Sequence, residues 1–251
     1  FHWLILKLEK TMFESGQCKK FIAISQMVKN DILKHYHCPR ENISVVYNGV
    51  DLKRFHPENE NRQSIRKELG VAENAVLILF VGSGFERKGL KYLLEATQYL
   101  RSEDWRLVIM GKGKWKQYLQ FAPENLRSRI IHKDPVPEIE NYYSAADIFA
   151  LPSIYEPFGN ANLEALATGL PVITTRHCGA ADIIQHKLNG LIVENPESPK
   201  EIADNINILF DPVLRQSMSQ NARTLAEKFS PEKNTREMLR TYQEIISTQG
   251  K

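Results

Sequence analysis

The chain has 251 residues, 42% of them hydrophobic, and its 33 basic and 30 acidic residues give a formal net charge of +3 at pH 7. This composition is typical of a globular protein with a full core, and a charge so close to zero argues against nucleic acid as a partner. The three cysteines, Cys18, Cys38 and Cys178, have no CxxC spacing, which predicts neither a disulfide framework nor a zinc site and favours a reducing compartment such as the cytoplasm.

Residues 1–50 are predicted to form a helix followed by a small βαβ unit. Apolar side chains such as Trp3 and Leu8 have helical spacing up to residue 14, and this run is too short to span a membrane. The stretches "KFIAIS" and "ISVVYNGVD" predict strands, and "SQMVKNDILKHY" between them predicts a helix with Ser25 as its N-cap. Because the chain starts inside a helix and without Met, we expect it to be a fragment of a longer protein.

Residues 51–63 are polar, contain Pro57 and lack periodicity, which predicts a linker between domains. In residues 64–230, strands are predicted at 75–83, 106–113, 147–153, 170–175 and 190–194, and helices at 87–100, 137–146, 160–169, 198–210 and 212–228. Continuous apolar strands joined by helices predict a doubly wound α/β domain with a parallel sheet, whose ligands bind beyond the carboxyl ends of the strands. The segment 231–251 contains a last helix, which packs either on this domain or back toward the first 50 residues.

The first turn after a strand of this domain, "VGSGFERKGLKYLL", is a candidate phosphate site. Its small residues, which let a backbone approach a ligand closely, are Gly82, Ser83 and Gly84. Arg87 and Lys88 are expected at the start of the next helix, where the helix dipole disfavours cations, so a phosphate would be a suitable partner. Alternatively, the two cations form a solvated pair offset by Glu86. The turn matches neither the Walker lysine pattern nor the dinucleotide GxGxxG pattern.

A second such turn, "LPSIYEPFGNANLEALATGLPVITT", holds only two charged residues, Glu156 and Glu164. Pro157 disfavours helix at Glu156, so the helix is expected to begin near Asn160, with Glu164 inside it. The start of this helix could receive an anion, and the two carboxylates could accept hydrogen bonds from hydroxyl groups on either side of it. A nucleotide diphosphate sugar has this chemistry. The alternative makes both glutamates ordinary surface charges.

The spacing of Glu156 and Glu164 inside "EPFGNANLEALATGLPVI" resembles the donor-site motif of the retaining glycosyltransferases of family 4. The stretch "NGVDLKRFHP" is similar to the interdomain junction of that family, and "FVGSGFERKGL" to its phosphate-binding turn. The resemblance implies the GT-B architecture. Residues 64–230 would then form its Rossmann-like, nucleotide-sugar-binding donor domain, and residues 1–50 the tail end of an incomplete Rossmann-like domain on the acceptor side.

The resemblance also implies roles for individual residues. Lys88 and Arg87 would bind and neutralise the donor diphosphate, so that no metal ion or other cofactor is expected. Glu156 would bind hydroxyls of the transferred sugar, and Glu164 those of the ribose. The base would lie near Lys133 and Val136. The remaining donor-binding residues would be Gly82, Ser83, Gly84, Phe158, Gly159, Asn160, Ala161, Asn162 and Leu163.

The stretches "LEKTMFESGQCKKFIAIS", "HYHCP" and "TTRHCGAADII" look most similar to bacterial lipopolysaccharide core glucosyltransferases that act on heptose. The resemblance therefore implies retaining transfer of a hexose, glucose in the first place, from a nucleotide diphosphate sugar such as UDP-glucose to a saccharide or lipid-linked saccharide, in the cytoplasm or at the inner face of its membrane. A nucleotide-sugar-binding module that is inert by itself and a nucleotide-sugar 2-epimerase of the same architecture stay open as alternatives. Peripheral membrane contact through the first helix and the oligomeric state also stay open.

Overall fold

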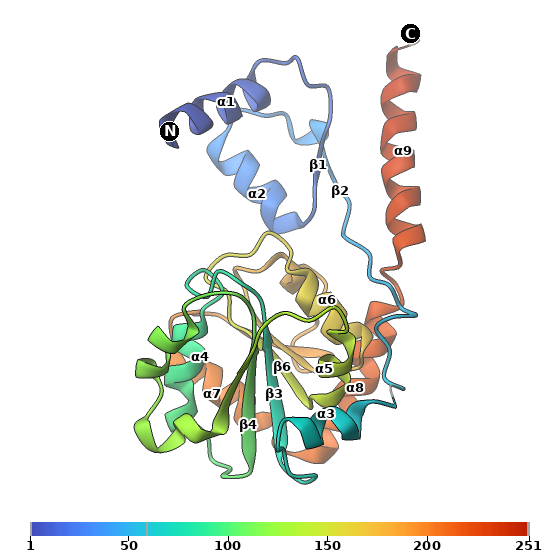
Figure 1. The fold of residues 1–251 in the computed structure, drawn as a ribbon. Coiled ribbons are helices and arrows are strands. Elements are labelled where there is room, and N and C mark those ends of the chain that lie inside the picture. The colour runs from blue at the N-terminus through green and yellow to red at the C-terminus, as the bar shows by residue number, and fades with distance from the viewer. Residues whose placement is uncertain (1, 59, 250–251) are drawn as a thin grey trace.

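The computed structural model describes residues 2–58 and 60–249 and has two lobes (Figure 1). The larger lobe is a sheet covered by helices on both faces, and the smaller lobe lies beyond one end of its strands. The last helix of the chain stands beside the smaller lobe. None of the described helices is long and apolar enough to cross a membrane.

The smaller lobe is a βαβ unit with one preceding helix. It consists of α1 (His2–Glu14), β1 (Phe21–Ala23), α2 (Gln26–His35), the 3₁₀ turn η1 (Arg40–Asn42) and β2 (Ile43–Val45). The strands β1 and β2 pair in parallel, and Ser25 caps α2 by accepting a hydrogen bond from the backbone N–H of Val28. The predicted βαβ unit and its N-cap are confirmed. No residue of α1 is buried.

The sheet of the larger lobe has six strands in the order β5-β4-β3-β6-β7-β8, and all neighbouring strands are parallel. The strands are β3 (Val76–Val81), β4 (Trp105–Met110), β5 (Ile130–Lys133), β6 (Ile148–Leu151), β7 (Val172–Thr175) and β8 (Gly190–Val193). The chain runs outward from β3 to β5 and then returns to the other side of β3, so the strand order reverses between β3 and β6. This confirms the predicted doubly wound fold, in which ligands bind beyond the carboxyl ends of the strands at the point of reversal.

Two sets of helices cover the sheet (Figure 1). Helices α4 (Leu90–Ala96) and α7 (Pro199–Ile208) pack together on one face, and α3 (Arg62–Glu68), α5 (Glu140–Ala145), α6 (Asn160–Ala167) and α8 (Pro212–Ala226) lie on the other. Short 3₁₀ turns are η2 (Thr97–Tyr99), η3 (Trp115–Gln117), η4 (Leu119–Phe121), η5 (Glu124–Arg129) and η6 (Gly179–Asp182). The predicted helices are all present, although α4 begins at residue 90 rather than 87 and α5 at 140 rather than 137.

Two elements of the larger lobe, α3 and β5, are absent from the sequence prediction. The sequence of α3, "RQSIRKE", has Ile65 as its only apolar side chain, so it shows no helical periodicity. Strand β5, "IIHK", has only two apolar residues and ends in a charge. Both elements are held by contacts with distant parts of the chain: β5 pairs with β4, and α3 is held by two of its arginines.

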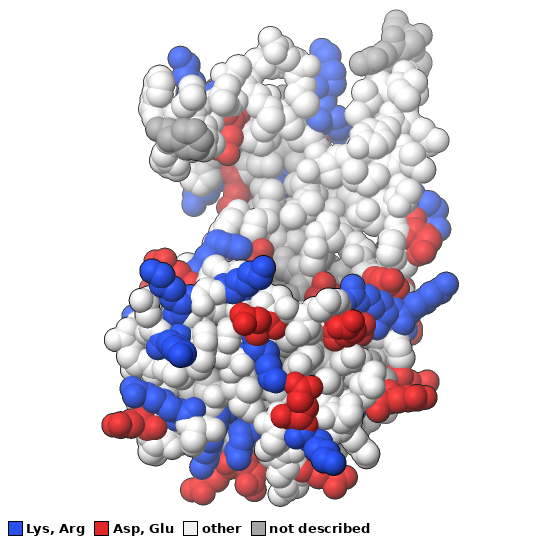
Figure 2. Space-filling view, viewed as in Figure 1, with Lys and Arg blue, Asp and Glu red and all other residues white. Residues whose placement is uncertain are grey.

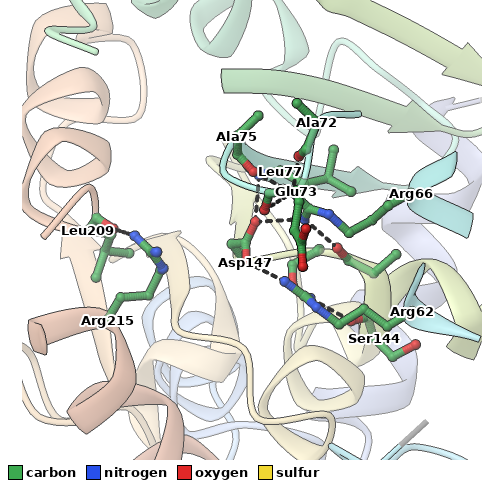
Figure 3. A network of polar contacts seen from close by, with 12 residues as sticks. Arg62, Arg66, Ala72, Glu73, Ala75, Leu77, Ser144, Asp147, Leu209 and Arg215 are labelled. Atoms are coloured by element: carbon green, nitrogen blue, oxygen red, sulfur yellow. Dashed lines mark hydrogen bonds and ion pairs between the residues drawn. The ribbon is translucent and has the colours of Figure 1, made fainter. Parts of the chain in front are cut away.

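These two arginines bind one carboxylate at the amino end of the sheet (Figure 3). Arg62 Nη2 lies 2.7 Å from Asp147 Oδ1, and Arg66 Nη1 lies 3.0 Å from Asp147 Oδ2. The same Oδ2 accepts a hydrogen bond from the backbone N–H of Leu77, at 2.8 Å. Because Asp147 immediately precedes β6 and Leu77 lies in β3, this group joins α3 to both central strands. We call Arg62, Arg66 and Asp147 the amino-end clamp.

The chain crosses from the smaller to the larger lobe after β2 and crosses back before the last helix, α9 (Pro231–Gln249). At these crossings the backbone N–H of Val50 donates to the carbonyl of Phe229 at 2.9 Å. At the start of α9, Asn234 Nδ2 donates to the carbonyl of Tyr47 at 2.7 Å. The helix is therefore tied to the segment that leaves the smaller lobe, and Figure 1 shows it continuing alongside that lobe.

Replacing Asp147 by Asn is expected to destabilise the protein strongly. The Arg66 side chain is only 6% exposed, so the substitution leaves a buried guanidinium without its counter-charge. Removal of one partner of a buried ion pair costs about 3–5 kcal/mol. We expect a decrease of this order in the free energy of unfolding, measured by urea denaturation.

The matched control is Glu194→Gln, which removes an ion pair with Arg176 whose side chains are both more than half exposed. An exposed pair contributes less than about 1 kcal/mol, so this variant should unfold almost as the unaltered chain does. Equal stability of the two variants would contradict the role given to the amino-end clamp.

Candidate functional site

The turn between β3 and α4 places two cations beyond the carboxyl end of β3. Gly82 has a φ of 146°, and a Cβ at this position would lie 2.9 Å from Lys88 Nζ, so only glycine lets the lysine side chain cross this backbone. Helix α4 begins at Leu90, with Gly89 at φ 71° as its N-cap. The prediction that Arg87 and Lys88 stand at the helix start is therefore wrong. The helix-dipole argument for a phosphate does not apply to these two cations.

Both cations bind Glu156, which follows β6. Lys88 Nζ lies 2.8 Å and Arg87 Nη1 lies 3.0 Å from Glu156 Oε2. The side chains of Lys88 and Glu156 are each 12% exposed, whereas that of Arg87 is 49% exposed. Among the residues that the structure describes, Glu156 Oε1 has no hydrogen-bond partner, so this oxygen is available to a ligand. We call Glu156, Lys88 and Arg87 the Glu156 cluster.

Helix α6 carries the second glutamate. It begins at Asn160, which confirms the predicted start, and follows Gly159 at φ 81°. A Cβ at Gly159 would lie 3.0 Å from Glu156 Cγ, so the glycine allows the Glu156 loop to turn directly into the helix. One helical turn further on, Glu164 Oε2 accepts a hydrogen bond from the hydroxyl of Tyr143, at 2.7 Å.

The Glu164 side chain is partly buried. Burial raises its pKa above the ordinary value, although the hydrogen bond from Tyr143 and the charges of Arg54 and Lys88 oppose this rise. Tyr143 has no exposed surface and packs edge-on against Phe55, and burial raises the pKa of its phenol well above the usual range. The phenol therefore stays protonated and donates to the carboxylate. The charged form of Glu164 is therefore less favourable in the folded chain than in the unfolded chain.

The predicted donor-binding residues at the start of α6 fall into two groups. Asn160 is exposed and Ala161 is half-buried, so both face outward at the helix start. Three others have buried side chains, namely Phe158, Asn162 and Leu163. The backbone N–H of Asn162 donates to the carbonyl of Gly159, so it is not available to a phosphate. Asn162 supports the loop from within.

Cys178 supports the same loop. Its thiol donates to the carbonyl of Phe158 at 3.1 Å and accepts a hydrogen bond from Asn162 Nδ2 at 3.2 Å. Burial raises the pKa of Cys178 to about 11, so the side chain remains a thiol at neutral pH. A buried, protonated thiol is a poor nucleophile, and this cysteine is structural.

The other predicted residues lie along the same edge of the sheet. Ser83 Oγ accepts a hydrogen bond from the backbone N–H of Lys112, which joins the turns after β3 and β4, and Gly84 is exposed beside it. Lys133 ends β5 and forms an ion pair with Glu68 at 2.7 Å, a hydrogen bond that raises the pKa of the lysine. Val136 packs against the core beyond β5. The structure thus gathers the residues after β3 and β6 into one site, while the two residues predicted to border the base lie on the β5 side of it.

The smaller lobe docks on two loops of the larger lobe near this site. Ser25 Oγ donates to the carbonyl of Pro157 at 2.7 Å. From η6, Asp182 Oδ2 accepts hydrogen bonds from the backbone N–H groups of Gln26 and Met27, at 2.6 and 3.3 Å. Burial raises the pKa of Asp182, against the effect of these two bonds. The N-terminus of α2 therefore rests on the loops that surround the Glu156 cluster.

Two side-chain pairs also join the lobes. Asn48 Nδ2 donates to Asn160 Oδ1 at 2.7 Å, and the hydroxyl of Tyr155 donates to Asp31 Oδ2 at 2.9 Å. Burial and the bond to Asp31 together raise the pKa of Tyr155 to about 12. The rim of the site is thus built from residues of both lobes.

Reasoning from the sequence misses Tyr143, Arg54 and Asn48. Tyr143 lies in "YYSAADIFALPS", where helical periodicity accounts for it as a core residue. Arg54 lies in the predicted linker, where its Nε donates to Glu140 Oε2 at 2.9 Å and its charge acts on Glu164. Asn48 and Arg54 belong to the quoted stretch "NGVDLKRFHP", so a signal for both was present, but it indicated a junction rather than a part of the site.

Comparison with known families matches two segments of the chain. Residues 61–225 match the family described as Glycosyl transferases group 1, and residues 1–54 match Glycosyltransferase Family 4. The first match includes the Glu156 cluster and Glu164, and the second includes the whole smaller lobe.

Individual relatives match almost the whole chain. An uncharacterized glycosyltransferase of Methanocaldococcus jannaschii is 30% identical in an alignment of 239 positions that covers 92% of this chain and 61% of the relative. The lipopolysaccharide glucosyltransferase WaaG of Escherichia coli is 28% identical in an alignment of 226 positions that covers 87% of this chain and 60% of that protein. The crystal structure of a glycosyltransferase from Rickettsia africae superposes with a TM-score of 0.84 at 26% identity, covering 96% of this chain and 66% of the other. The chain therefore spans about three fifths of the length of these curated relatives.

Replacing Glu164 by Gln is expected to stabilise the free chain at pH 7. The raised pKa means that the folded state disfavours the carboxylate, and glutamine keeps an acceptor for Tyr143 without the charge. The penalty is present in full above the folded pKa of Glu164. It is relieved as the pH falls through that pKa and is gone below the ordinary carboxyl range. The gain in free energy of unfolding should therefore be seen at pH 7 and disappear near pH 4, by urea denaturation at both values.

Glu124→Gln serves as the control, because Glu124 is exposed on η5, which leads into the edge strand β5, whereas α6 follows β6. This variant should show no comparable change with pH. An E164Q protein that is no more stable than the unaltered chain at pH 7 would show that burial does not penalise the Glu164 carboxylate.

Proposed function

The chain belongs to the glycosyl transferases group 1 family, and on this basis we propose that the protein transfers a hexose from a nucleotide diphosphate sugar to a hydroxyl group of a saccharide. The observation that carries the proposal is the Glu156 cluster beyond β3 and β6, with Glu164 on the helix that follows. Its position supports the proposal, because doubly wound sheets bind nucleotides where their strand order reverses.

In the proposed complex the donor diphosphate lies against Lys88 and Arg87. An ammonium group has three N–H donors and a guanidinium five, so both cations can bind phosphate oxygens while they remain bonded to Glu156. When the bond to the sugar breaks, negative charge develops on the leaving diphosphate. The two cations, held in place by Glu156, neutralise this charge without rearrangement. We therefore assign charge neutralisation to these side chains and propose no metal or other cofactor.

The two glutamates bind the hydroxylated ends of the donor in this proposal. Glu156 Oε1, which has no partner in the described chain, accepts hydrogen bonds from hydroxyls of the transferred sugar. Glu164 accepts them from the ribose, and its hydrogen bond with Tyr143 fixes the direction of the carboxylate. Lys133 and Val136, on the β5 side, border the base.

At a finer level, we propose glucose as the sugar, UDP as the nucleotide, a lipopolysaccharide core as the acceptor, and retention of anomeric configuration. The support is the 28% identity to the lipopolysaccharide glucosyltransferase of Escherichia coli and the Glu156 to Glu164 spacing. We place the protein in the cytoplasm, at the inner face of the membrane. Helix α1 fits a membrane surface, since Trp3 and Leu8 are 71% and 62% exposed and Lys7 and Lys10 lie between and beside them.

A nucleotide-sugar-binding module without transfer activity is the second candidate for the chain as it stands. The observation that favours it is the length, because the chain spans about three fifths of its curated relatives. The donor-binding residues all lie in the larger lobe. On this candidate the chain binds the donor, and transfer requires acceptor-binding residues on another segment.

Replacing Lys88 by Met is expected to weaken binding of UDP about tenfold or more. Methionine keeps the volume of the side chain over Gly82 but removes a charge-assisted hydrogen bond to the diphosphate, and such bonds contribute about 1.5–3 kcal/mol. Isothermal titration calorimetry with UDP measures the change.

Lys91→Met is the matched control, because Lys91 lies in α4 and its Nζ pairs with Glu95 at 3.9 Å, outside the Glu156 cluster. Its affinity for UDP should equal that of the unaltered chain. If K88M also binds UDP with unchanged affinity, the diphosphate site is not at the Glu156 cluster.

Transfer itself is tested by incubating the chain with UDP-glucose and a deacylated lipopolysaccharide core, with the product followed by proton NMR. We expect an α-glucoside from the α-configured donor, because the spacing of Glu156 and Glu164 resembles the donor-site motif of retaining enzymes. A β-glucoside would contradict retention. Consumption of UDP-glucose without acceptor would favour a nucleotide-sugar 2-epimerase, and UDP-glucose binding without turnover would favour the binding module.

A further inference from the structure

Arg54, in the segment that joins the two lobes, is bonded to a loop on the β5 side of the site. This loop, residues 134–139, connects β5 with α5, and we call it the β5–α5 loop. Arg54 Nε and Nη2 donate to Glu140 Oε2 at 2.9 and 2.8 Å, and Nη2 also donates to the carbonyl of Pro137. Figure 2 shows basic and acidic side chains next to one another on the right of the molecule, where Figure 1 places the passage from the smaller to the larger lobe.

The β5–α5 loop has few other anchors. Four of its six residues are exposed, and its prolines, Pro135 and Pro137, have no backbone N–H to donate. Val136 and Ile139 are half-buried and pack against the core. In the part of the chain that the structure describes, the bond from Arg54 is the only hydrogen bond between this loop and a distant segment. The position of the loop backbone therefore depends on Arg54.

The Arg54 side chain is held in one orientation although it is 43% exposed. Its guanidinium carbon lies 5.2 Å from the ring centroid of Phe55, which is buried and packs edge-on against Tyr143. Asp51 Oδ1 accepts hydrogen bonds from the backbone N–H groups of Lys53 and Arg54, at 2.9 and 3.0 Å, which fixes the backbone of the same turn. An exposed ion pair alone fixes a side chain weakly, but here a ring, a carboxylate and a carbonyl hold one guanidinium.

Arg54 also acts on the glutamate of helix α6. The hydrogen bond to Glu140 raises the pKa of Arg54 most, and the charge of Glu164 adds to the rise. Burial raises the pKa of Glu164, and the charge of Arg54 opposes that rise. One guanidinium is thus bonded to the loop that contains Val136 and lies within electrostatic reach of Glu164. In the proposed complex these are the residues that border the base and bind the ribose.

We propose that Arg54 is a positioning residue for the nucleoside of the donor. It holds the β5–α5 loop where the loop borders the base, and so sustains the part of the affinity that comes from the nucleoside rather than from the diphosphate. The proposal rests on the proposed function, since it takes the diphosphate to lie against the Glu156 cluster and the base beside Val136.

The two halves of the donor should respond differently to the loss of Arg54. Hydrogen bonds to the edge of a base are lost when the donor–acceptor distance grows from about 2.9 to about 3.6 Å, so a small displacement of the loop removes them. The diphosphate is bound by Lys88 and Arg87, which belong to the turn after β3. Its binding does not depend on the β5–α5 loop.

The test replaces Arg54 by Met, which keeps an unbranched apolar side chain next to Phe55 but has no donor for Pro137 or Glu140. Isothermal titration calorimetry measures the affinity of the 251-residue chain for UDP and for inorganic pyrophosphate. We expect R54M to bind UDP about tenfold more weakly, as for the loss of one or two hydrogen bonds to the base. Its affinity for pyrophosphate should equal that of the unaltered chain, which also shows that the variant is folded.

Lys53→Met is the matched control, because Lys53 is the exposed neighbour of Arg54 and its side chain has no ion-pair partner among the described residues. It should leave both affinities unchanged.

Three outcomes overturn the proposal. Unchanged UDP affinity in R54M would show that Arg54 does not position the nucleoside. An equal loss of affinity for UDP and pyrophosphate would show that Arg54 acts on the site as a whole through the fold. Equal affinity of the unaltered chain for the two probes would leave the nucleoside without a contribution. The proposed function fails separately, through unchanged UDP binding in K88M, which should otherwise weaken the binding of both probes.

Discussion

The central strands β3 and β6 pair in parallel, and a carboxylate bound by two cations lies at each end of this pair. Asp147 is the carboxylate at the amino end and Glu156 the one at the carboxyl end, and the larger lobe is organised around them. At the amino end, both oxygens of Asp147 are used, and a backbone N–H of β3 adds a third bond. At the carboxyl end, both cations lie closest to the same oxygen of Glu156, and no hydrogen bond to its second oxygen is found in the described chain. The first arrangement uses both carboxylate oxygens and links three segments of the fold. The second keeps hydrogen-bonding capacity for a ligand.

Glu164 shows the same division between stability and binding. A carboxylate in the second turn of a half-buried helix costs the folded chain free energy, and Tyr143 offsets only part of this cost. A glutamine, which keeps an acceptor for the Tyr143 hydroxyl without the charge, would suit the free protein better at this position. Sites that bind ligands are commonly less stable than the rest of a fold in this way, which agrees with the proposed role of Glu164.

Much of the larger lobe could be predicted from the sequence because its strands are continuous apolar runs and its long helices have regular apolar spacing. The start of α6 followed from Pro157 and Gly159, whose local backbone preferences act without help from distant residues. By contrast, α3 and β5 carry almost no local signal, and distant contacts such as the bond from Arg62 to Asp147 create them. For the same reason the sequence could indicate that Lys88 and Glu156 matter, but not that they bind each other. Their positions are 68 residues apart, and only the strand order brings them together.

The position of Asp182 has a consequence for how the two lobes move. The first N–H groups of a helix need acceptors from outside it, and for α2 two of them are satisfied by this carboxylate of the larger lobe. Pulling the lobes apart therefore also uncaps α2, so separation and fraying of this helix are one coupled event rather than two. The hydroxyl of Ser25, which bonds at once to its own helix and to Pro157, adds to the same coupling. A hinge at this junction would pivot about the N-terminus of α2. This pivot would lie next to the loop that carries Glu156, because Ser25 bonds to Pro157.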